Sequence, residues 1–152
     1  MTHAPPAPTA HAAPTVHADL PGTRSYARRG FWYVPADATC EVADPFDNSH
    51  RVPALGLLVI ARAREFKTRP AEVETTWYAV QSADTGRPDV ASFYLLKLAP
   101  AGGEQAVYEV TGGANGRRCT CPAGAAGTPC VHLDSLAAAI ALKALPGPKS
   151  PR

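Results

Sequence analysis

The chain has 152 residues, of which 45% are hydrophobic, and its formal net charge is +2. This length suits one ordinary domain, and the near-neutral charge lacks the concentrated basic surface that is usual in nucleic-acid-binding proteins. The longest apolar runs, 54–61 and 136–142, are far too short to cross a bilayer, and the first twenty residues contain no Lys or Arg and no Leu, Ile or Val run. We therefore expect a protein of the cytoplasm, without a secretory signal or a membrane partner.

The N-terminal residues 1–25 predict a disordered arm. Prolines recur through this segment, and the Ala, Thr and His residues between them show no apolar periodicity. Every Phe, Trp and Tyr of the chain lies between Tyr26 and Tyr108. The hydrophobic core should therefore begin after the arm, and we expect a single domain over residues 26–145.

Apolar runs and alternating segments predict a series of strands, at 31–34, 55–63, 72–81, 93–98 and 106–111. In the third of these, Trp77 and Ala79 fall on one face and Tyr78 on the other. The turn-forming stretches 84–88 and 100–103 separate the later strands. Strands joined by turns this short should pair antiparallel, as a meander.

A single helix is predicted over residues 132–145, which are rich in Ala and Leu. Leu133, Leu136 and Ile140 recur at helical spacing and form an apolar stripe that can lie on the sheet. Asp134 in the first turn and Lys143 in the last would suit the helix dipole. Prolines and a glycine at 146–148 end the helix, and 146–152 should form a flexible tail. The predicted fold class is therefore a small α+β domain.

Four residues near the C-terminus form the pattern C-x-C-x8-C-x-H: Cys119, Cys121, Cys130 and His132. Three thiolates and one imidazole match the donors that Zn²⁺ prefers in a tetrahedral site. The first two cysteines lie two residues apart, so an extended segment points both sulfurs to one side. Pro and Gly residues then turn the chain back, and Cys130 arrives just before the helix. The spacing predicts a β-turn-α knuckle that holds one structural zinc ion per chain.

This pattern, with its Cys-Thr-Cys-Pro and Pro-Cys-Val-His segments, resembles the SWIM zinc finger. The resemblance covers residues 106–145, from the strand at 107–110 to the helix. It implies that the four residues of the pattern are the zinc ligands. SWIM domains accompany Swi/Snf-type helicases, transposases, kinases and recombination accessory proteins, so the resemblance also implies binding to DNA or to protein.

Other uses of the cysteines are a disulfide between Cys121 and Cys130 or a redox pair of Cys119 and Cys121. The histidine two residues after Cys130 argues against both, because a disulfide needs no imidazole. Cys40 is left over, which suits a reducing compartment better than a disulfide framework. We expect it to be a small buried apolar residue.

Three hypotheses for the function follow. The first is a zinc-stabilised module that binds a protein or a nucleic acid, with a slight preference for protein. In it, Arg117 and Arg118 either contact phosphate or only solubilise a turn. The second is a thiol-based redox or metal-handling protein. The third is an enzyme that uses His50 with Asp44 or Asp47, although such residues are common in loops. A zinc ion whose four positions are all filled by protein ligands does not activate water, so we expect no enzyme.

Overall fold

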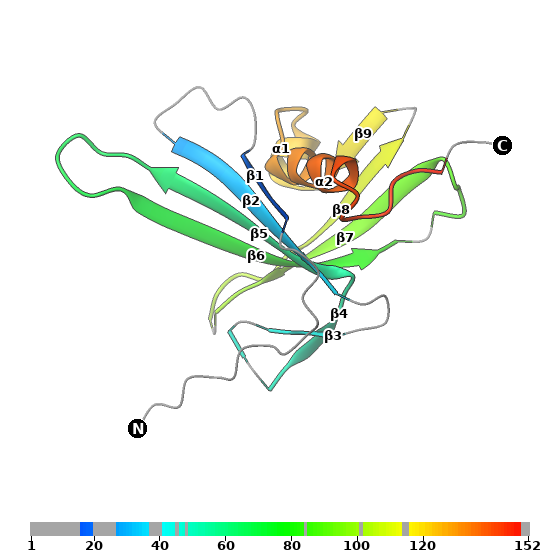
Figure 1. Cartoon of the computed structure of the whole chain (residues 1–152), viewed down its shortest axis with the longest axis horizontal. Helices are drawn as coiled ribbons and strands as arrows, with labels where there is room; N and C mark the ends of the chain where they lie inside the picture. Colours follow the sequence, from blue (N-terminus) through cyan, green and yellow to red (C-terminus); the bar gives the residue numbers. More distant parts are fainter. Residues whose placement is uncertain are drawn as a thin grey trace.

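The computed structural model describes residues 16–19, 27–36, 41–44, 46–47, 49–83, 85–100, 102–113 and 116–149. The largest part of the fold is one antiparallel sheet with the strand order β1-β2-β5-β6-β7-β8-β9 (Figure 1). Its strands are β1 (Val16–Asp19), β2 (Ala27–Pro35), β5 (Gly56–Arg64), β6 (Glu72–Ser82), β7 (Val90–Leu98), β8 (Val107–Gly113) and β9 (Gly116–Cys119). From β5 to β9 each strand pairs with the next one in the chain, so the predicted meander is confirmed.

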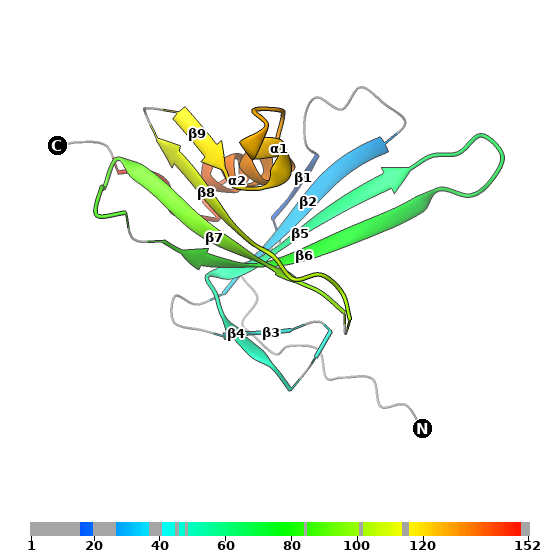
Figure 2. The ribbon, with the colours of Figure 1, turned by 180° about the vertical axis from the view of Figure 1, so that it is seen from behind.

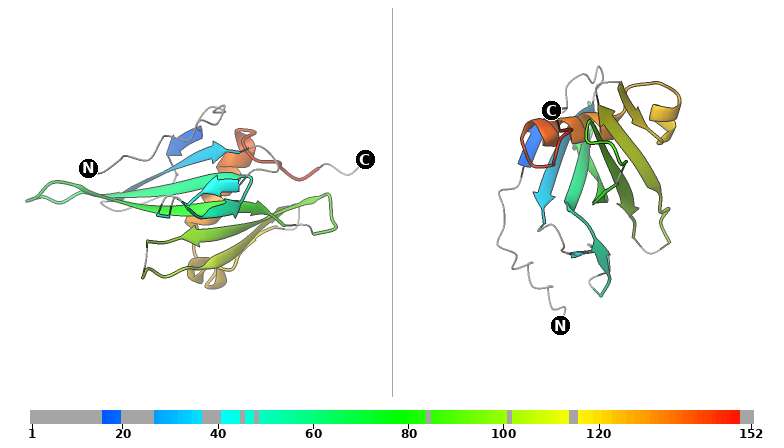
Figure 3. Two further views of the ribbon diagram at one scale, coloured as in Figure 1. Left: turned by 90° about the horizontal axis from the view of Figure 1, so that it is seen from below. Right: turned by 90° about the vertical axis from the view of Figure 1, so that its right-hand side faces the viewer.

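The sheet bends so that its two halves rise on either side of the helices. The helices α1 (Pro122–Ala125) and α2 (Val131–Ala141) lie between these halves, on the concave face (Figures 1 and 2). A separate hairpin of β3 (Glu41–Ala43) and β4 (Arg51–Pro53) lies beneath the sheet on the other side, as the two further views also show (Figure 3). The sheet is therefore the middle layer of the domain, and both of its faces are covered near the centre.

The two covered faces explain the sequence patterns of the central strands. In β5, Leu58 and Ile60 belong to the main core under the helices, whereas Leu57 packs toward the β3–β4 hairpin. In β6, Tyr78 enters the main core and Ala79 the smaller one. Burial of both faces accounts for the continuous apolar run of β5, and the two faces predicted for β6 are confirmed.

The N-terminal segment contains a strand where the sequence predicts disorder. Val16–Asp19 forms β1 and pairs antiparallel with β2, in a register that sets Val16 opposite Tyr33. The expectation of disorder is therefore wrong for these four residues. Strand pairing uses main-chain groups, so it needs no apolar periodicity in the added strand. The rest of 1–25, and Cys40, lie outside the described residues.

The main helix ends four residues earlier than the sequence predicts. After Ala141 the chain closes with two hydrogen bonds, from the Lys143 N–H to the Ile140 carbonyl and from the Ala144 N–H to the Ala139 carbonyl, both 2.9 Å. This pair defines a Schellman motif, in which Lys143 takes a left-handed conformation with φ of 59°. Lys143 therefore follows the helix and does not lie in its last turn.

The segment after the helix, residues 146–149, lies along the domain. The Lys149 N–H donates a hydrogen bond of 2.7 Å to the Pro88 carbonyl, and Pro148 lines a pocket beside α2. The predicted flexible tail is therefore attached to the domain over these residues. Neither described helix is long and apolar enough to span a membrane.

Candidate metal centre

Each of the four predicted ligands lies at the end of a short element. Cys119 is the last residue of β9, Cys121 is the N-cap of α1, Cys130 is the N-cap of α2, and His132 lies in the first turn of α2. The predicted β-turn-α arrangement is thus present. The connecting segment contains the single helical turn α1, which the sequence does not predict.

Local hydrogen bonds set the positions of the first two cysteines. The Thr120 N–H donates to the Glu109 carbonyl at 3.0 Å, and the Glu109 N–H donates to the Thr120 Oγ1 at 2.9 Å. These bonds fasten the chain to β8 between Cys119 and Cys121. Gly124 then passes so close to Cys119 that a Cβ at this position would overlap the Cys119 carbonyl oxygen. A glycine is therefore required in α1.

The four side chains converge on one point. All four donor atoms lie within 4.8 Å of one another, close enough to hold one metal ion. The Cys121 and Cys130 sulfurs are 3.3 Å apart, and the His132 Nδ1 lies 3.6 Å from the Cys130 sulfur and 3.9 Å from the Cys119 sulfur. Each of the four residues is at most 7% exposed. The group is therefore a closed, buried set of three sulfur donors and one nitrogen donor.

A tyrosine from the middle of the sheet orients the histidine. The Tyr78 Oη lies 2.9 Å from the His132 Nε2, while the Nδ1 faces the sulfurs. A metal on the Nδ1 requires its lone pair, so the proton resides on the Nε2, which then donates to the tyrosine hydroxyl. The rings of Tyr78 and Tyr108 also pack against the imidazole, each with its centroid 5.0 Å away. The alternation of β6 predicts the face on which Tyr78 lies, but no pattern in the sequence indicates its contact with His132.

Burial controls the protonation of the metal-free group. It lowers the pKa of His132 to about 4, so the imidazole is neutral at physiological pH and ready to ligate. Burial also raises the pKa of Cys119 to about 12 and raises the pKa of Cys130. At Cys121 burial acts in the same direction, but N–H groups such as that of Gly124 outweigh it and lower its pKa. A metal must therefore displace protons from at least two of the thiols.

The two arginines before Cys119 lie on the strand β9 at the edge of the sheet, and both line one cavity there. Both are exposed on β9, and alternation along the strand directs their side chains to opposite faces. Arg117 lies on the concave face, where its Cγ would be 3.8 Å from a Cβ on Gly112, its partner in β8. Arg118 lies on the other face, together with Thr120.

The polar residues between β3 and β4 form a loop. The buried Asp44 accepts a hydrogen bond of 2.9 Å from the Phe46 N–H, and its other oxygen lies 3.6 Å from the Nδ1 of the exposed His50. Asp47 accepts hydrogen bonds from both the N–H and the hydroxyl of Ser49. Asp44 and Asp47 thus accept hydrogen bonds from nearby main-chain N–H groups, as Asp residues commonly do in turns.

The chain was also compared with known proteins. No family model, no curated protein and no solved structure matches it. The interpretation of the site therefore depends on its own chemistry and geometry.

Proposed function

We propose that the chain is a zinc-binding module of the SWIM type with one structural ion. The convergence of Cys119, Cys121, Cys130 and His132 within 4.8 Å is the observation that carries this proposal. A tetrahedron with Zn–S bonds of about 2.3 Å and a Zn–N bond of about 2.0 Å has edges of about 3.5–3.8 Å. Three of the six donor–donor separations, 3.3, 3.6 and 3.9 Å, lie close to these edges, and all six are within 4.8 Å. Three sulfurs and an imidazole also favour zinc over calcium or magnesium, which prefer oxygen.

The proposed role of the ion is to join the end of one strand to the first residues of two helices. The ligands come from the end of β9 and from the first residues of α1 and α2. A zinc ion at this point would fix the helices against the sheet and contribute binding free energy on the order of 10 kcal/mol to folding. All four positions would be filled by protein, so no water could be activated there, and we propose a role other than catalysis.

The distribution of charge supports a protein partner more than a nucleic acid. The cations of the β5–β6 hairpin are partly neutralised by acidic neighbours, since Arg64 lies 3.8 Å from Glu74 and Arg69 lies 3.2 Å from Glu72. Arg117 and Arg118 leave β9 on opposite faces, and of the residues that the structure describes they are the only two cations on the lining of the cavity that they share. We therefore propose that the module recognises protein, in a reducing compartment such as the cytoplasm, where thiol ligands persist.

Metal analysis combined with thiol counting tests this function against the thiol-based alternative. The alternative is favoured by one observation, the 3.3 Å between the Cys121 and Cys130 sulfurs, which would bring two free thiols close to reaction. We expect purified protein to hold one zinc per chain and to show, under native conditions, no reactive thiol apart from Cys40. Labile zinc and rapid thiol modification of the other cysteines would instead establish the redox or metal-handling function.

A salt titration of DNA binding tests the choice of partner. We expect binding weaker than micromolar at physiological salt. Submicromolar binding that weakens steeply with salt, and that is lost when Arg117 and Arg118 are both replaced by Ala, would establish a nucleic-acid partner instead.

A further inference from the structure

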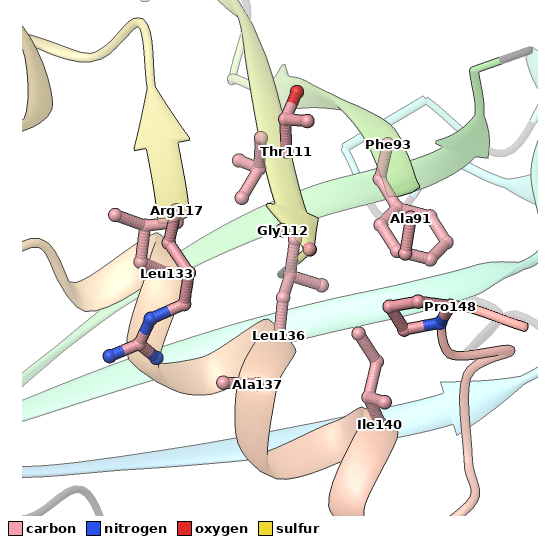
Figure 4. A pocket seen from close by; sticks show the side chains of 12 residues that line it. Ala91, Phe93, Thr111, Gly112, Arg117, Leu133, Leu136, Ala137, Ile140 and Pro148 are labelled. Carbon is pink, nitrogen blue, oxygen red and sulfur yellow. The ribbon is translucent and has the colours of Figure 1, made fainter. Parts of the chain in front are cut away.

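An apolar pocket lies between α2 and the concave face of β7, β8 and β9. It has a volume of about 260 Å³, and none of the four metal ligands lines it. Figure 4 shows the side chains around it, contributed by the sheet on one side and by the helix on the other. The bulkiest apolar side chains of the lining are Phe93, Val110, Leu133, Leu136 and Ile140.

Small residues leave this space open. Gly112 on β8 and Ala137 on α2 both line the pocket, and neither has a bulky side chain. Bulky side chains at these positions would let the helix and the sheet meet directly. The small residues of β8 and α2 therefore determine that the pocket exists.

The cationic side chain of Arg117 lies at one end of this apolar lining. The Arg117 guanidinium lies beside Leu133, whereas Phe93 and Pro148 lie at the opposite end (Figure 4). No acidic residue lines the pocket, and among the described residues Arg117 forms no ion pair. A ligand that complements this site has an apolar body and an anionic group at one end.

We propose that the pocket binds the C-terminal end of a partner polypeptide, with an apolar side chain in the pocket and the terminal carboxylate on Arg117. This inference deepens the proposed function, on which it rests, because it names the chemistry of the protein partner. It also gives Arg117 a role that its neighbour Arg118 does not share.

The lining favours a chain end over the middle of a chain. Besides Arg117, the only polar side chain of the lining is Thr111, and its hydroxyl is already within 3.1 Å of the Ser92 hydroxyl. A segment that passes through the pocket would bury main-chain N–H and C=O groups without partners. A C-terminal residue buries fewer of these groups, and its carboxylate meets the one free cation of this pocket.

Titrations of the zinc-loaded full chain, followed by amide chemical shifts in NMR, test the proposal. The probes are N-acetyl-Leu-Leu with a free carboxylate, the same dipeptide as its neutral amide, and N-acetyl-Gly-Gly with a free carboxylate. We expect the first probe to shift the resonances of the pocket residues and to bind about tenfold more tightly than the amide, the effect of one charge-assisted hydrogen bond. The glycine probe should not bind, because it has no side chain to fill the pocket.

Two variants and one control locate the binding. Arg117→Gln should reduce the affinity of the carboxylate probe to that of the amide, whereas Arg118→Gln, on the other face of β9, should leave it unchanged. Ala137→Leu should fill the pocket and abolish binding. Because Arg117 is exposed, its replacement leaves the core intact, so it remains decisive even if Ala137→Leu disturbs folding.

Equal binding of the carboxylate and the amide, or an equal effect of the two arginine variants, would overturn the proposal. Zinc is quantified in the same samples. Protein that holds zinc but binds no probe refutes the pocket and leaves the proposed function standing. Protein that binds the carboxylate probe without retaining zinc supports the pocket and refutes the structural ion.

Discussion

Replacement of Tyr78 by Phe tests whether the sheet orients the candidate metal ligand His132. The substitution removes only the hydroxyl that lies 2.9 Å from the His132 Nε2, across 54 residues of sequence. The ring remains and continues to pack on the imidazole. The protonated Nε2, buried with its residue 7% exposed, would then lack its partner. An unsatisfied buried donor costs about 1–3 kcal/mol, and loss of such a supporting contact lowers metal affinity about 10- to 100-fold.

Tyr108→Phe is the matched control for this experiment. Tyr108 also packs on the His132 ring with its centroid 5.0 Å away, but in the described part of the chain its hydroxyl forms no hydrogen bond to His132. Zinc affinity is measured by competition with a chromophoric chelator at neutral pH. We expect Tyr78→Phe to weaken zinc at least about tenfold and Tyr108→Phe to change it less than about threefold. Equal affinities for both variants and the parent would refute the assigned role of Tyr78.

Three further predictions concern protons and two special backbone positions. Burial raises the pKa of Cys119 to about 12 and also raises that of Cys130, so zinc displaces at least two protons near neutral pH, whereas His132, with a pKa of about 4, releases none. Zinc affinity should therefore rise about 100-fold from about pH 6.5 to about pH 7.5. An affinity that does not depend on pH would contradict this. Gly124→Ala should lower zinc affinity in the same competition assay because its Cβ overlaps the Cys119 carbonyl, whereas Gly112→Ala, whose Cβ meets only an ordinary contact, should not. Lys143→Gly should stabilise the domain by about 0.5–1 kcal/mol in urea unfolding, because glycine adopts the left-handed conformation without strain, and a loss of stability would refute the Schellman ending.

The sequence predicted the strands of the meander as far as β8. The strands β5 to β8 carry clear apolar runs or alternation, and the turns between them determine an antiparallel order. The convergence of the four candidate metal ligands was predictable because their spacing is local and their donor types are specific. Their positions at the end of β9 and the start of α2 agree with that prediction.

The contacts that depend on distant segments were not predictable. Tyr78 reaches His132 only because the sheet folds over the helix, and no pattern within β6 distinguishes it from another core tyrosine. Strand β1 lies in a Pro-rich segment and is held through main-chain pairing, which leaves no periodicity to detect. The helix ends at a left-handed lysine, where the composition predicts several more residues of helix. In each of these cases tertiary contacts or main-chain geometry outweigh local composition.

Thermal unfolding of the zinc-loaded and metal-free protein tests the central claim most directly. If one ion holds β9, α1 and α2 together, removal of zinc by a strong chelator should abolish the helical circular dichroism of the C-terminal segment and lower the melting temperature. Added zinc should restore both, and a Cys121→Ala variant should behave as metal-free protein whether or not zinc is added. An unchanged melting curve and helical signal in the metal-free protein would contradict the structural role of the ion.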